Sequence, residues 1–271
     1  MKKLKYVLSA SGLLLAACSK SIYAPTNKIY KQQAKSFAQT VGQYPPATPG
    51  QDSLDLAKDF VGTINFNLRK PNFVIIHYTA QDSVAQTLKT FTLTRTQVSA
   101  HYVVAKDGKI YHMLNDYMRA WHAGVGKWAN DADINSSSIG IEIDNNGTEP
   151  FTTPQIASLT KLLGNLKKNY NIPAANFIGH ADIAPKRKPD PGVLFPWKDL
   201  ARKGFGLWYD DILELPPVTF DYRKALHTIG YDVSDYNAAI VAFKKHFIQT
   251  DVRPHLTQLD MNVIYNLYQK Y

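Results

Sequence analysis

The apolar run at residues 73–76 leads directly into His77 and predicts a buried strand with an imidazole at its end. Residues 101–106 also have the pattern of a strand, and so do residues 139–143, where Glu142 stands between two isoleucines. The alternation around Glu142 places its carboxylate on the face opposite its apolar neighbours. The sequence therefore predicts strands that carry polar groups in addition to building a core.

Helical patterns follow these strands. Apolar side chains recur at helical spacing over residues 154–170, and Thr153 is the expected cap of that helix. Toward the carboxyl terminus, three amphipathic stretches predict three more helices, at residues 223–229, 234–247 and 256–268. With 271 residues, of which 45% are hydrophobic, the chain is long enough for one moderate domain and a second, small one.

Two histidines and one aspartate form a candidate metal site. His77, His180 and Asp190 are the usual ligand set of a catalytic zinc, and three protein ligands leave a fourth position open for water. The chain has no HExxH helix and no CxxC pair, so these ligands come from distant segments and meet only in the folded protein. Taken singly, a histidine at the end of a strand is more often a hydrogen-bonded core residue.

Three segments in the order 74–79, 138–143 and 179–192 resemble the zinc-dependent N-acetylmuramoyl-L-alanine amidases related to phage T7 lysozyme. The resemblance spans residues 65–197, and its DPG and FPW motifs near the end are similar to the lipoprotein branch of that family. It implies an α/β fold, a mixed central sheet flanked by helices as in T7 lysozyme and the peptidoglycan-recognition proteins. It also implies one zinc ion on His77, His180 and Asp190, and cleavage of the amide between N-acetylmuramic acid and L-alanine.

Two further residues are candidates for catalysis. Glu142 matches the catalytic glutamate of the family and is the best group to move a proton to the departing amine. Lys188 stands two residues before Asp190, so in an extended stretch both side chains project to the same side, and the family places its oxyanion-stabilising lysine there. Without the resemblance, both are ordinary solvated residues, as Lys186 and Arg187 are expected to be.

Substrate contacts are predicted from the segment between the strands. Trp121 and Trp128 can stack on sugar faces, although large aromatic residues are as often core. His122 is expected near the cleft, either beside a metal ligand or on the glycan. Asn135, which precedes three serines, offers an amide to the peptide stem, although such polar clusters are usually loops.

The other histidines are expected to be structural. His101 begins a strand pattern, and His112 follows an Asp-Gly turn that predicts a hairpin. His227, His246 and His255 lie in the carboxyl-terminal stretch and are not expected to join the catalytic domain.

The amino terminus has the pattern of a lipoprotein leader. Residues 1–17 combine lysines, a short apolar run and a small-residue cleavage site, and Cys18, the only cysteine, follows directly. Lipidation of Cys18 would attach the chain to a bacterial membrane, and Ser19 favours the outer membrane with the protein facing the periplasm. An ordinary secretory signal is the alternative. Residues 18–52 are expected to form a polar tether with one short helix near residues 32–40.

The domain prediction places the zinc amidase in residues 53–210 and a helical module in residues 217–271. The module resembles the peptidoglycan-binding domain often appended to such amidases, and a helical appendage packed on the catalytic domain is the alternative. The net charge of +9, from 31 basic and 22 acidic residues, favours an anionic wall polymer over nucleic acid as partner, with a solvated basic surface as the default. The sequence gives no prediction of an oligomeric partner.

The leading hypothesis is a zinc amidase of peptidoglycan or muropeptides that serves wall turnover or recycling. A non-catalytic peptidoglycan-recognition protein shares the fold but lacks part of the metal site. A zinc hydrolase acting on another amide of the stem peptide is a third possibility. The complete set of His77, Glu142, His180, Lys188 and Asp190 favours an enzyme.

Overall fold

The computed structural model describes residues 21–43, 63, 65, 68 and 70–271. The chain divides into two compact units, residues 1–66 and 67–271. In the first unit, α1 (Ala24–Val41) extends beyond the short helix expected at residues 32–40, and none of its residues is buried. The predicted leader and Cys18 lie outside the described residues. Among the helices that the structure describes, none has both the length and the apolar character needed to cross a bilayer.

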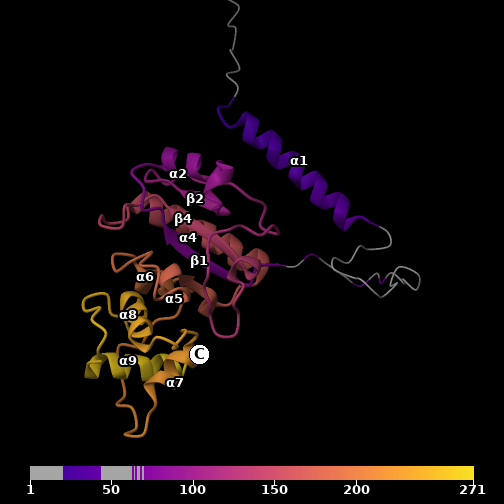
Figure 1. The fold of residues 1–271 in the computed structure, drawn as a ribbon. Coiled ribbons are helices and arrows are strands. Elements are labelled where there is room, and N and C mark those ends of the chain that lie inside the picture. Colours follow the sequence, from indigo (N-terminus) through magenta and orange to yellow (C-terminus); the bar gives the residue numbers. More distant parts are fainter. Residues whose placement is uncertain (1–20, 44–62, 64, 66–67, 69) are drawn as a thin grey trace, which may run out of the picture. The chain divides into compact units, whose positions relative to one another are not determined.

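The second unit is built on a mixed sheet with the strand order β3-β2-β4-β1-β5 (Figure 1). β1, β2, β4 and β5 run parallel, and only β3 pairs antiparallel, in the predicted hairpin with β2. This arrangement confirms the expected mixed sheet. The strands are β1 (Phe73–Tyr78), β2 (Tyr102–Val104), β3 (Ile110–His112), β4 (Ser138–Ile143) and β5 (Phe177–Gly179).

Helices occupy the connections between strands and the carboxyl-terminal segment. They are α2 (Val84–Phe91), α3 (Ile134–Ser137), α4 (Thr153–Tyr170), α5 (His180–Ile183), α6 (Trp197–Arg202), α7 (Tyr222–Ile229), α8 (Tyr236–Phe247) and α9 (Gln258–Tyr268), with 3-10 turns η1 (Thr94–Thr96) and η2 (Ala174–Asn176). The cap of α4 is Thr152, and the assignment to Thr153 was wrong. Thr152 Oγ1 accepts from the backbone N–H of Gln155, whose side chain accepts from the Thr152 N–H, which forms a capping box.

The two faces of the sheet have different roles. Alternate residues of β1 and β4 point to one face, where they form a core with α4 and α6. This core contains Val74, Ile76, Ile139, Ile141, Ile143, Leu159, Leu163 and Trp197, among others. The opposite face of the same two strands carries Ile75, His77 and Glu142, so the candidate chemistry lies on the face turned away from α4.

The three predicted carboxyl-terminal helices form, but they have no separate core. Ala225, Phe243 and Val263 belong to one hydrophobic cluster with Ile75 of β1 and Ile183 of α5. α8 packs on α5 and α6, as Figure 1 shows. The boundary expected at residue 217 therefore does not separate two compact units of the described structure. Packing of these helices on the catalytic part leaves their binding to the wall a prediction.

Candidate active site

The parallel strands bring the candidate ligands to one edge of the sheet. His77 is the fifth residue of β1, and it pairs in register with Glu142 of β4. β5 lies on the other side of β1 and ends at Gly179, so that His180 begins α5 at the same edge. Asp190 follows in the loop after α5. His180 and Asp190, which are 103 and 113 positions from His77 in the sequence, thus lie beside it in the folded chain.

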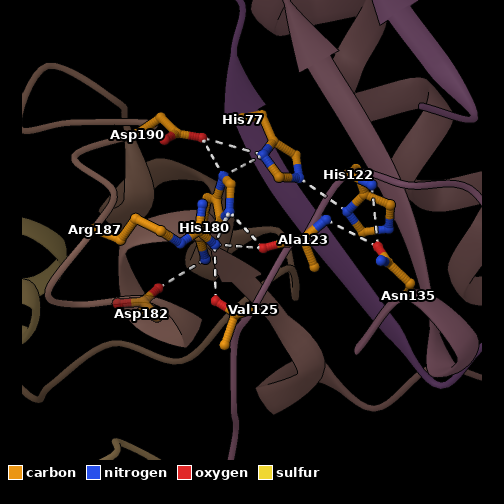
Figure 2. Close-up of polar contacts among 10 residues, drawn as sticks. His77, His122, Ala123, Val125, Asn135, His180, Asp182, Arg187 and Asp190 are labelled. Carbon is orange, nitrogen blue, oxygen red and sulfur yellow. Dashed lines mark hydrogen bonds and ion pairs between the residues drawn. The ribbon is translucent and has the colours of Figure 1, made fainter. Parts of the chain in front are cut away.

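Figure 2 shows that the three ligand atoms converge on one point. His77 Nδ1 lies 2.8 Å from His180 Nδ1, and Asp190 Oδ2 lies 3.1 Å and 3.0 Å from these two nitrogens. All three side chains are buried, and they form the one His/Cys/Asp/Glu group with metal-ligand proximity in the described part of the chain. Atoms this close together could serve as ligands of a single divalent metal ion.

The partner of His180 Nε2 shows which nitrogen of this ring carries the hydrogen. His180 Nε2 lies 3.0 Å from the carbonyl oxygen of Ala123, and a carbonyl can only accept, so Nε2 carries the hydrogen. In the neutral ring, Nδ1 is then a bare lone pair that points at His77 and Asp190.

A chain of hydrogen bonds shows in the same way which nitrogen of His77 carries the hydrogen. The Ser138 hydroxyl donates to the carbonyl of Ile134, so it accepts from His122 Nε2 at 3.1 Å. His122 Nδ1 is therefore an acceptor, and it receives the Nε2–H of His77 at 3.1 Å. Burial, and then the neighbouring His180, lowers the pKa of His77 to about 4, which keeps its ring neutral.

With the outer nitrogens as donors, the Nδ1 atoms of both rings and Asp190 Oδ2 face one another. Such a buried group is electrostatically unfavourable unless a cation joins it. The donor set of two imidazole nitrogens and one carboxylate fits a divalent metal, and the outer nitrogens are held by protein groups as is usual for metal-bound histidines.

A cavity of about 330 Å³ opens over the three ligands. Its lining includes Trp121, His122, Glu142, Lys188 and the three candidate ligands. Glu142 Oε2 is buried and has no hydrogen-bond partner among the described residues. Burial first, and then the charge of Asp190, raises the pKa of Glu142 well above its usual range, while Lys188 acts in the opposite direction. A carboxyl group that lines the cavity with an unpartnered oxygen is suited to proton transfer.

Comparison with known proteins decides the family. A model of the family Amidase_2, described as N-acetylmuramoyl-L-alanine amidase, matches residues 67–193. The N-acetylmuramoyl-L-alanine amidase AmiD of Escherichia coli is 36% identical over 209 residues, which cover 65% of this chain and 75% of that protein. The chain belongs to the N-acetylmuramoyl-L-alanine amidase family. The resemblance that the sequence motifs indicated is thereby confirmed.

Two solved structures extend this similarity to the fold of the amidase. The complex of E. coli AmiD with anhydro-N-acetylmuramic acid-L-Ala-D-gamma-Glu-L-Lys matches with a TM-score of 0.68 at 31% identity, covering 78% of this chain and 93% of that one. The complex of AmpDh3 from Pseudomonas aeruginosa with anhydromuramic pentapeptide matches with a TM-score of 0.68 at 29% identity, covering 83% and 99% of the two chains.

The residues predicted to contact substrate have different surroundings. Trp121 is half exposed at the cavity, so it is free to stack on a sugar. His122 is buried between His77 and Ser138, and Asn135 Oδ1 accepts from the backbone N–H groups of His122 and Ala123 at 3.0 and 2.9 Å. The side chains of His122 and Asn135 thus form hydrogen bonds within the surroundings of the candidate ligands, as Figure 2 shows.

Close packing around His122 requires a glycine in β4. A Cβ added at Gly140 would lie 2.3 Å from His122 Cγ, a distance that no relaxed structure tolerates. Gly140 also donates its N–H to His101 Nδ1, and His101 Nε2 bonds the Met118 carbonyl, so His101 is structural as expected. Trp128 is buried against Gly230 and Tyr231, so it belongs to the core.

Two contacts near the ligands were missed in the sequence. Arg187, expected to be solvated, donates to the carbonyls of Ala123 and Val125 at 2.7 and 2.8 Å, which holds the loop that accepts from His180. His246, expected to stay outside the catalytic domain, lies 2.8 Å from Asp182 of α5. Neither contact has a local signal in the sequence, because both partners are about 60 residues away.

Proposed function

We propose that this amidase hydrolyses the amide between the lactyl group of N-acetylmuramic acid and L-alanine in muropeptides, with one zinc ion held by His77, His180 and Asp190. The observation that carries the proposal is the convergence of His77 Nδ1, His180 Nδ1 and Asp190 Oδ2 at the cavity. The two relatives solved with anhydromuramyl peptides support the substrate class.

When bound, zinc supplies Lewis acidity for attack of water on the amide carbonyl. Glu142 accepts the proton of the attacking water as the new C–O bond forms. The same group then delivers that proton to the nitrogen of L-alanine as the C–N bond breaks, so a carboxylic acid and an amine leave. Glu142 pairs in register with His77, so its carboxylate and the His77 imidazole project from the same face at the same level of the sheet, which supports this role.

Lys188 stabilises the negative charge that develops on the carbonyl oxygen. It lines the same cavity as Glu142 and is half-buried, whereas Lys186 and Arg187 are exposed. Arg187 also lines the cavity, but its guanidinium is engaged by the carbonyls of Ala123 and Val125. A fixed cation in a site shielded from water stabilises such charge more than a solvated one does. Trp121 offers its exposed ring to the sugar at the rim of the cavity.

The test is a digest of a defined anhydromuramyl peptide and of intact sacculi, analysed by mass spectrometry. The proposal predicts release of the intact stem peptide with free L-alanine at its amino end, and no release after chelation until zinc is restored. Alanine left on the sugar would indicate hydrolysis of another bond. Binding without any product would indicate a recognition protein.

The proposal also includes attachment of the amidase to the periplasmic face of the outer membrane through a lipid on Cys18. The helix α1 supports this location. Lys28, Lys31 and Lys35 form one stripe of the helix, which has no acidic residue, while Phe37 and Val41 are exposed on another side. Five residues separate Cys18 from Ala24, and the six Cα–Cα steps between them span at most about 22 Å, so a lipid on Cys18 would keep α1 close to the headgroups.

Fractionation of cells that express the full chain tests this location. The amidase is expected in the outer-membrane fraction and to incorporate labelled fatty acid, whereas the Cys18→Ser variant is expected to do neither. Labelling that persists in Cys18→Ser would contradict the assignment. Wall binding by residues 217–271 stays a prediction, and equal binding to sacculi after their deletion would exclude it.

A further inference from the structure

Asp182 connects the ligand-bearing helix α5 to the carboxyl-terminal helices. Its carboxylate is buried at 2% exposure, and a buried carboxylate requires donors. Oδ2 accepts from the backbone N–H of Gly179 at 2.7 Å and from His246 Nδ1 at 2.8 Å. Oδ1 accepts from the hydroxyl of Tyr231 at 2.8 Å. Two of the three donors therefore come from the carboxyl-terminal segment.

The ring of His246 is held in place by packing. It stacks on Trp197 with centroids 4.0 Å apart and on Phe247 with centroids 4.1 Å apart, at 15° in both cases. Its Nε2 is buried without a partner among the described residues. An Nε2–H there would be an unsatisfied donor, so the hydrogen of the neutral ring sits on Nδ1 and points at Asp182.

Tyr231 is fixed just as firmly. The preceding Gly230 has φ +135°, and a Cβ at that position would lie 2.3 Å from the indole of Trp128. The Gly230 carbonyl accepts from the N–H of Ala129 at 2.7 Å. The close packing of the Gly230 backbone on the Trp128 ring therefore holds the turn before α8 against the catalytic part of the fold. It also places the Tyr231 hydroxyl beside Asp182.

The geometry of α5 makes this connection relevant to the metal site. Residues two apart on a helix point to nearly opposite sides, so His180 faces the ligands while Asp182 faces the carboxyl-terminal helices. α5 has only four residues, too few to be stable on its own. A rotation of so short a helix would displace His180 Nδ1 from His77 and Asp190.

We infer that His246 and Tyr231 are positioning residues for the metal ligand His180, acting through Asp182. The carboxyl-terminal helices are then part of the support of the metal site, whether or not they also bind wall. This inference rests on the zinc site proposed above. Measuring zinc binding by the unaltered amidase separates the two, because absence of binding there contradicts the site and not the support.

Two substitutions at His246 separate hydrogen bonding from packing. His246→Phe keeps a ring against Trp197 and Phe247 but removes the donor to Asp182. His246→Asn keeps an N–H donor in about the place of Nδ1 but removes the stacked ring. Zinc affinity, measured on the full chain by competition with a chromophoric chelator, is expected to fall about tenfold in His246→Phe and much less in His246→Asn. Tyr231→Phe, which loses only a hydroxyl, is expected to weaken zinc binding in the same direction.

Lys244→Met is the matched control. Lys244 lies on the same helix α8, is fully buried, and pairs with Asp260 at 2.9 Å and Asp251 at 3.2 Å, without contact to Asp182. It is expected to lower the urea midpoint and leave zinc affinity unchanged. Zinc affinity that follows the urea midpoint across all four variants, or that falls in His246→Asn and not in His246→Phe, would overturn the inference.

Discussion

His77 on β1 and Glu142 on β4 occupy paired positions of two parallel strands. Because side chains at paired positions project to the same face, the ligand imidazole and the carboxylate share one wall of the cavity. The sheet itself thus fixes the distance between a metal ligand and the group proposed to move protons. Because each residue stands on its own strand, either side chain can be substituted while the other stays in place, so that their roles can be tested separately.

Glu142→Gln is expected to keep zinc and lose about 10²- to 10⁴-fold in kcat, because the amide cannot accept the proton of water. Zinc content of the purified variant is the control, since it shows that the three ligands still converge. Hydrolysis of an anhydromuramyl peptide gives the rate. Activity equal to that of the unaltered amidase would remove Glu142 from the mechanism.

Lys188→Met is expected to reduce kcat by about 10²- to 10³-fold, the usual effect of losing one group that stabilises an oxyanion. Zinc content and the urea midpoint should not change. Lys186→Met is the matched control, because this neighbour is exposed and pairs only at 3.9 Å with Asp235. Equal losses in both variants would mean that general charge, and not position, matters.

His122→Ala is expected to weaken zinc binding by about 10- to 100-fold, because it leaves the outer N–H of His77 without its acceptor. Ser138→Ala should act in the same direction and less strongly, since it removes the partner of His122 at one step further from the ligand. His112→Ala, at an exposed histidine, serves as the control. Chelator competition measures the zinc affinity of all three variants. Unchanged affinity in His122→Ala would exclude a contribution of this chain of hydrogen bonds to zinc binding.

The metal-free amidase is expected to lose stability in acid through its buried imidazoles. Burial lowers the pKa of His77 to about 4 and that of His122 well below its usual value, against 6.5 for an exposed histidine. The folded state binds fewer protons than the unfolded one below pH 6.5, so this stability is present above 6.5 and is lost as pH falls toward 4. Urea midpoints of the metal-free protein between pH 7.5 and 4 measure it, and His77→Gln should show a shallower decline.

The sequence predicted the parts of the site that have local signals. The strand that leads to His77 follows from its apolar run, and the strand around Glu142 follows from alternation. The mixed sheet was implied by the family resemblance of the motifs. The burial of His122 could not be predicted, because it depends on a glycine in β4 and a serine 16 residues away. The contact of His246 with Asp182 likewise spans 64 residues and exists only after the carboxyl-terminal helices have packed.

The zinc content of the unaltered amidase and of His77→Ala, His180→Ala and Asp190→Ala, each dialysed against a weak chelator, tests the central claim most directly. One zinc ion is expected per unaltered chain and almost none in each variant, with loss of muropeptide hydrolysis in step. Zinc retained at full content by any of the three folded variants, or hydrolysis that continues without zinc, would contradict it.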